Sequence, residues 1–99
     1  MSEKLEVLEE LLLGEEGLLI SLRLGDGLNQ KRVDEVCNIL KELEVDWSGK
    51  DFIPKKAADL FVDLYPAMES SCGLYDENEG LEIMDAADKI MDRIRGCIT

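Results

Sequence analysis

A chain of 99 residues is long enough for one domain with a single hydrophobic core, and its 45% share of apolar residues argues against wholesale disorder. The 23 acidic and 11 basic residues give a formal net charge of -12, which disfavours binding to nucleic acid and to anionic membrane surfaces. The same charge favours basic proteins and cations. We therefore expect residues 1–99 to form one acidic domain.

The N-terminal sequence Met1-Ser2-Glu3-Lys4 lacks the basic start and the apolar stretch of a secretory signal. No apolar run approaches the roughly 18 residues that a membrane-spanning helix needs. Three widely spaced cysteines, Cys37, Cys72 and Cys97, favour reduced thiols inside a cytosolic protein over a disulfide framework. The sequence thus predicts a cytoplasmic protein that does not bind a membrane.

The first quarter of the sequence predicts two short helices. Ser2 suits an N-cap, and leucines follow it at helical spacing until Gly14 interrupts the pattern. From Ile20 to Leu24 apolar and polar residues alternate, which is also the pattern of a strand. No second strand is evident, and a lone strand would leave its backbone groups unsatisfied. We therefore favour a short helix over residues 18–24, with a strand as the alternative.

The second quarter contains one long amphipathic helix. Asn29 can cap this helix, and from Gln30 to Glu44 apolar residues recur three and four positions apart. The polar run from Asp46 to Asp51 predicts a loop. Trp47 lies within that run but continues the apolar stripe of the helix, so we expect its ring to cover one end of the core.

The second half of the chain predicts two more helices. Pro54 suits the first position of a helix that bends at Pro66 and continues to about Ser71. After a connector over residues 72–75, the acidic run from Asp76 to Glu79 suits the start of a final helix, whose apolar face extends to Ile98. Four to five helices joined by short loops predict an all-α fold, a small single-domain antiparallel helical bundle.

The residue types that carry chemistry are poorly arranged for it. The absence of histidine, together with the absence of any CxxC pair, excludes the usual zinc sites. The absence of histidine also removes the usual base for a serine or cysteine nucleophile. A calcium loop that began at Asp76 would place Leu81 and Ala87 where glycine and glutamate are required. Carboxylate pairs such as Asp59 and Asp63 lie opposite the apolar stripe, so both should stay ionised. We expect no catalytic site, no metal and no cofactor.

The segment from Ala57 to Asp88 is the most negative part of the chain. It holds nine carboxylates and no Lys or Arg. Apolar residues recur among them at helical spacing, which predicts a buried side and an acidic side for each helix. An aromatic residue surrounded by charges is typical of a binding hot spot. The predicted partner-binding residues are Asp59, Asp63, Glu69, Tyr75, Asp76, Glu79, Glu82, Asp85 and Asp88.

Two functions suit these features, beside the plain reading of the acids as a solubilising surface. The first is an inhibitor, such as an immunity or antitoxin protein, that blocks a basic toxin or nuclease with an acidic helical face. The second is an adaptor or structural module that docks, or forms a homodimer, through an apolar helix face. An apolar patch away from the acids would favour the second function.

Overall fold

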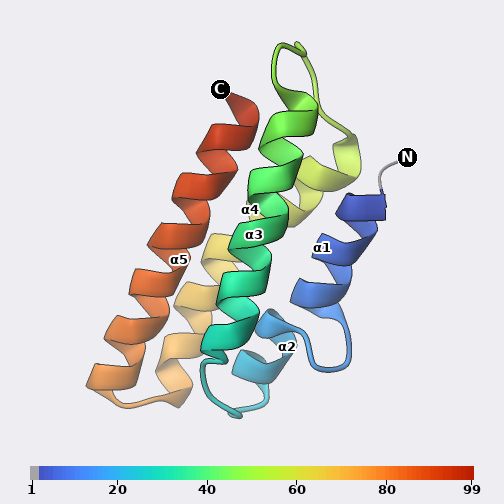
Figure 1. The fold of residues 1–99 in the computed structure, drawn as a ribbon. Helices are drawn as coiled ribbons and strands as arrows, with labels where there is room; N and C mark the ends of the chain where they lie inside the picture. Colours follow the sequence, from blue (N-terminus) through green and yellow to red (C-terminus); the bar gives the residue numbers. More distant parts are fainter. Residues whose placement is uncertain (1–2) are drawn as a thin grey trace.

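The protein is an all-α helical bundle, as the sequence predicts. The computed structural model describes residues 3–99, so the predicted N-cap at Ser2 lies outside the described residues. In chain order the elements are α1 (Glu3–Leu13), α2 (Leu18–Arg23), α3 (Gln30–Trp47), α4 (Lys55–Ser71), the 3-10 turn η1 (Cys72–Leu74) and α5 (Glu77–Ile98). In Figure 1, α3 lies between α1 and α5, and α4 packs behind them.

The directions of the helices follow from their contacts. Successive long helices alternate in direction, as expected for an antiparallel bundle (Figure 1). The most extensive contact joins α3 to α5, which are not successive. Lys89 pairs with Asp34 at 3.8 Å, and further along both helices Cys97 contacts Leu40 at 3.3 Å. Since the residue numbers rise together, α3 and α5 run in the same direction.

The starts of α3 and α4 lie at or next to the positions that the sequence indicates. The Asn29 side chain accepts a hydrogen bond from the backbone N–H of Arg32 at 3.1 Å, at the start of α3. Pro54 is the N-cap residue of α4 and not its first helical residue as predicted, because the helix begins at Lys55. This helix continues through Pro66 to Ser71, as predicted.

The segment with the alternating pattern is helix α2. Its buried residues are Leu18, Leu19 and Leu22, and the four-residue spacing from Leu18 to Leu22 places both on one side of a helix. The helical prediction is therefore confirmed for residues 18–23, and Leu24 is the C-cap. A strand would have placed Leu18 and Leu19 on opposite faces and left one of them in solvent.

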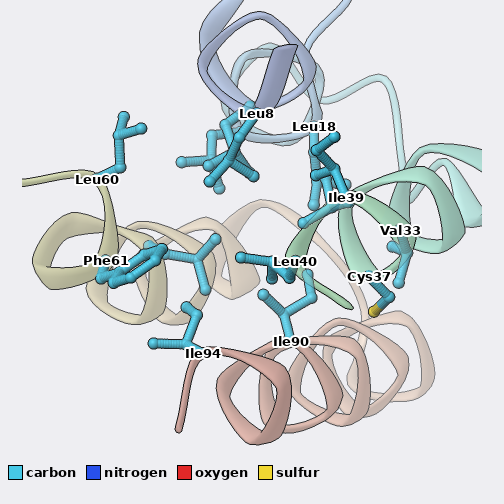
Figure 2. Close-up of a cluster of buried hydrophobic side chains, with 14 of the residues drawn as sticks. Leu8, Leu18, Val33, Cys37, Ile39, Leu40, Leu60, Phe61, Ile90 and Ile94 are labelled. Carbon is cyan, nitrogen blue, oxygen red and sulfur yellow. The ribbon is translucent and has the colours of Figure 1, made fainter. Parts of the chain in front are cut away.

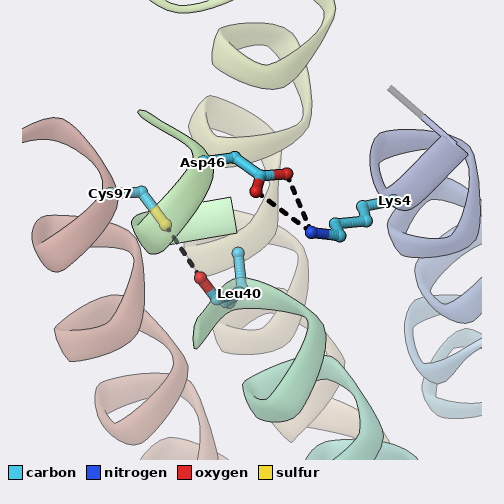
Figure 3. A network of polar contacts seen from close by, with 4 residues as sticks. All are labelled: Lys4, Leu40, Asp46 and Cys97. Carbon is cyan, nitrogen blue, oxygen red and sulfur yellow. Dashed lines mark hydrogen bonds and ion pairs between the residues drawn. The ribbon is translucent and has the colours of Figure 1, made fainter. Parts of the chain in front are cut away.

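The predicted loop over residues 46–51 is wrong at its start, because α3 runs as far as Trp47. The Trp47 ring is buried and packs edge-on against Phe61, with ring centroids 6.3 Å apart, so it does cover one end of the core. Lys4 Nζ lies 3.0 Å from both carboxylate oxygens of Asp46, which ties the last turn of α3 to α1 (Figure 3). These contacts from other helices extend α3 beyond its local signal.

The five α-helices of residues 3–99 all contribute their apolar stripes to one core. Figure 2 shows this cluster, in which side chains from different helices point toward a common centre. Each helix supplies at least one residue that is no more than 1% exposed. Examples, one from each helix in chain order, are Leu8, Leu18, Leu40, Leu64 and Ile90. Across residues 3–99, none of the helices combines the length and the apolar character that crossing a membrane requires.

Candidate binding surface

The eight carboxylates predicted to bind a partner are all exposed. The ion pairs that the described residues form are Lys4–Asp46, Arg32–Glu16, Arg32–Glu35, Lys56–Glu9 and Lys89–Asp34. None of these pairs uses a carboxylate of residues 57–88, which we call the acidic segment. Lys56 directly precedes this segment and Lys89 directly follows it. Lys56 nevertheless pairs with Glu9 of α1, and Lys89 pairs with Asp34 of α3. Direct ion pairs within residues 3–99 therefore leave the charge of the acidic segment uncompensated.

On α4, the predicted carboxylates point in two directions. Successive residues of a helix lie about 100° apart around its axis, so Asp59 and Asp63 are only about 40° apart. Glu69 lies about 120° away from Asp63 by the same spacing. Asp63 lines a hollow together with Leu13 and Leu19, which places the Asp59–Asp63 side of α4 toward α1 and α2. Glu69 belongs to a different face of the helix.

On α5, a second group of carboxylates faces α3. Glu82 and Asp85 line a hollow of about 410 Å³ together with Leu28 and Lys89, beside the start of α3. Asp88 lies about 120° from Glu82 around the helix axis. The structure thus brings Glu82 and Asp85 together, but it does not place all the predicted carboxylates on one continuous face.

Asp76 and Glu79 stabilise the N-terminus of α5. The Asp76 side chain accepts a hydrogen bond from the backbone N–H of Glu79 at 2.8 Å, which is the N-cap bond of this helix. Both carboxylates lie at the positive end of the helix dipole, where negative charge is stabilising. Their position at the N-terminus of α5 is therefore explained by the fold, whether or not they also contact a partner.

Tyr75 is anchored within the protein. Its half-buried hydroxyl donates a hydrogen bond to the Leu22 carbonyl at 2.9 Å and accepts one from the Gly27 backbone N–H at 3.0 Å. Gly27 has φ of 94°, a left-handed conformation that favours glycine. The phenol therefore holds the turn between α2 and α3 against the chain that follows η1. These hydrogen bonds give the Tyr75 hydroxyl a structural role.

Replacing Tyr75 with phenylalanine should lower the free energy of unfolding by about 1–2 kcal/mol, because the Gly27 N–H and the Leu22 carbonyl each lose a partner at a half-buried site. Urea unfolding followed by circular dichroism measures this difference. Tyr65→Phe is the matched control, since Tyr65 is also half-buried and its hydroxyl forms no hydrogen bond within residues 3–99. Equal losses in the two variants would contradict the anchoring role of Tyr75.

A larger hollow that the sequence did not reveal lies between α2 and α4. We call it the α2–α4 groove; its volume is about 600 Å³, and its lining includes Leu13, Leu19, Arg23, Asp63, Ala67, Ser70 and Leu74. One signal was available, because the three successive leucines 11–13 cannot all face the same side of a helix. Of these three, only Leu12 is fully buried, and Leu13 is 43% exposed.

The cysteine thiols are structural. Cys37 and Cys97 are buried, and Cys72 is half-buried. The Cys97 thiol donates a hydrogen bond to the Leu40 carbonyl at 3.3 Å (Figure 3). Burial, with a smaller contribution from the Glu44 carboxylate, raises the pKa of Cys97 to about 11, so the thiol stays protonated near neutral pH. Among residues 3–99, no three His, Cys, Asp or Glu side chains are grouped so that they could hold a metal ion.

No protein-family model, curated protein or solved structure matches this chain. A function for this chain must therefore be inferred from its exposed surface. Its two notable features are the uncompensated charge of the acidic segment and the partly apolar α2–α4 groove beside Asp63.

Proposed function

We propose that the protein is a small, non-enzymatic binding protein of the cytoplasm that inhibits a basic protein partner, as an immunity or antitoxin protein inhibits a toxin or nuclease. The observation that carries this proposal is that the exposed carboxylates of the acidic segment enter none of the ion pairs formed within residues 3–99. Carboxylates in ion pairs would already be neutralised, whereas these have no cationic partner within residues 3–99.

The physical basis of such inhibition is electrostatic. Enzymes that bind phosphate groups commonly present cationic side chains at their active sites, and a surface rich in carboxylates can occupy the same place. Attraction between opposite charges also raises the rate of association, which matters for a protein that must intercept its target. A net charge of -12 on a chain of this size makes such steering strong and dependent on salt.

The test begins with the partner. A tagged form of the protein is used to recover binding proteins from its native host, and mass spectrometry identifies them. In a stopped-flow measurement at low salt, the double variant Asp85→Lys/Asp88→Lys should associate with the recovered partner about tenfold more slowly than the wild type. Its association rate should also depend less on salt. Both residues are exposed, so the thermal midpoint should change little.

Glu42→Lys/Asp51→Lys is the matched control, because both residues are exposed and lie outside the acidic segment. Each double variant changes the net charge by the same amount. A smaller decrease in the control would locate the contact on the acidic segment. If both variants slow association equally, the acidic segment acts only through net charge, and the proposed contact is wrong.

Self-association is the second candidate, and one observation favours it. Phe52 and Ile98 line a hollow at the end of the bundle, and they are 82% and 57% exposed. Exposed apolar surface of this kind can bury itself against a second copy. A dimer in analytical ultracentrifugation at physiological salt that Phe52→Ser converts to a monomer would support this candidate over the inhibitor.

A further inference from the structure

The α2–α4 groove combines an apolar floor with exposed leucines at its edges. Leu19 is 6% exposed, and Ala67 of α4 lines the groove beside it. Leu13, at the end of α1, and Leu74, at the end of η1, are 43% and 59% exposed. Single exposed leucines are ordinary on a protein surface, but two that line one hollow enlarge its apolar surface. The groove can therefore accept an apolar side chain from another molecule.

The rim of the groove carries charge of both signs. Asp63 lines it from α4, and Asp59 lies one helical turn earlier on nearly the same side. Arg23 lines it from the last turn of α2. Arg23 and Asp63 form no ion pair with each other in the part of the chain that the structure describes. A bound segment would therefore meet carboxylates on the α4 side and a guanidinium on the α2 side, and this asymmetry would orient it.

Charge decides between a second copy and a basic partner as the occupant. Two copies of this chain each carry a net charge of -12, so they repel one another on approach. A segment rich in Lys and Arg is instead attracted to the surface around the groove, where Asp59 and Asp63 lie. A volume of about 600 Å³ falls within the 300–1,000 Å³ range of small binding pockets, so it suits one apolar anchor with its neighbours.

We propose that the α2–α4 groove receives one large apolar side chain from a basic segment of the partner, while flanking Lys or Arg residues of that segment contact Asp59 and Asp63. This inference rests on the proposed function and adds that the partner binds at the α2–α4 groove. The anchor supplies buried apolar area at the centre of the contact, and the surrounding charges supply speed and orientation. An amphipathic basic helix meets both needs, because its apolar and basic residues occupy neighbouring faces.

Two synthetic peptides test the groove without knowledge of the partner. Both are helical, about 14 residues long or four turns, and carry the same lysines. The apolar stripe is leucine in one peptide and alanine in the other, so their charges are equal. We expect the wild-type protein to bind the leucine peptide about tenfold more tightly than the alanine peptide. In methyl NMR spectra, the signals of Leu13, Leu19 and Leu74 should shift with the leucine peptide.

Two tryptophan variants locate the effect. Ser70→Trp should fill the groove and reduce the preference for the leucine peptide to less than twofold, because Ser70 is exposed and lines the groove. Ala58→Trp is the matched control, since Ala58 is also exposed on α4 but lies about 120° away around the helix. It should retain the tenfold preference. Neither substitution changes the charge, and circular dichroism confirms that both variants fold.

The possible results separate the groove from the proposed function. If the wild type binds both peptides equally, or if Ser70→Trp keeps the preference, the groove does not receive an apolar anchor and the inference is overturned. Neither result affects the inhibitor proposal, which is tested by changing charge while the groove is intact. Loss of the preference in Ser70→Trp alone, with shifts confined to the groove leucines, supports the inference.

Discussion

Replacing Ile90 with alanine is expected to lower the free energy of unfolding by about 2–5 kcal/mol and the melting temperature by about 10 °C or more. Ile90 is 0% exposed and lies near the middle of α5. Its side chain points toward Leu40 of α3, with Ile94 beside it (Figure 2). Removing three carbon atoms here leaves a cavity at the most extensive helix contact, and close-packed neighbours collapse into it only in part.

Ile98→Ala is the matched control for Ile90, because it makes the same chemical change in the same helix at a residue that is 57% exposed. Its effect on the free energy of unfolding should stay within about 0.5 kcal/mol. Urea and thermal unfolding, followed by circular dichroism, measure both variants. A loss in Ile90→Ala as small as the one expected for Ile98→Ala would mean that the contact between α3 and α5 contributes little to stability.

The ends of several helices were predictable because local residues determine them. Asn29 and Asp76 carry side-chain oxygens that bond the first free N–H groups of α3 and α5. Gly14 follows the last residue of α1, as the sequence indicated. The end of α3 was not predictable in the same way, since Asp46 reads locally as part of a polar run. Its place in the helix is fixed by Lys4, which lies 42 residues away in sequence.

The exposure of the predicted binding residues also follows from the sequence. Helical spacing separates the carboxylates from the apolar stripes, and the eight predicted carboxylates are exposed. Their grouping depends on how the helices are rotated in the bundle. Periodicity alone shows that Asp63 and Glu69 diverge by about 120°, but it does not show that Asp63 faces α2. That fact requires the packing of α4 against α1 and α2.

Tyr75 shows the limit of reasoning from local composition. Its place among carboxylates suggested a binding hot spot, but its hydroxyl contacts residues 53 and 48 positions earlier in the chain. The residues adjacent to Tyr75 in sequence do not indicate contacts over such a distance along the chain. The groove was equally hidden, because Leu13 and Leu74 belong to different elements that meet only in the folded protein. Sequence reasoning thus identified the exposed carboxylates, and the structure adds the α2–α4 groove beside Asp63.

Replacing Gly17 with alanine should lower the free energy of unfolding by about 1–3 kcal/mol, although the change adds a single methyl group. Gly17 is buried at the N-cap of α2, and its N–H donates to the Gly14 carbonyl at 2.9 Å. An added Cβ would lie 2.6 Å from the carbonyl carbon and oxygen of Leu12 and 2.8 Å from the Gly14 nitrogen. All three are backbone atoms, so the turn between α1 and α2 must open to make room. Urea unfolding monitored by circular dichroism measures the loss.

Gly73→Ala separates this steric cause from the general effect of losing a glycine. Gly73 lies in η1, no heavy atom within 4 Å would meet an added Cβ, and its φ is not positive. There alanine should be neutral or raise the free energy of unfolding by about 0.4–1 kcal/mol, because it reduces the conformational freedom of the unfolded chain. Gly17→Ala should therefore destabilise the protein, whereas Gly73→Ala should not. If Gly17→Ala were as stable as Gly73→Ala, the turn between α1 and α2 would have to yield at little cost, and the tight packing of Leu12 against Gly17 would not constrain α2.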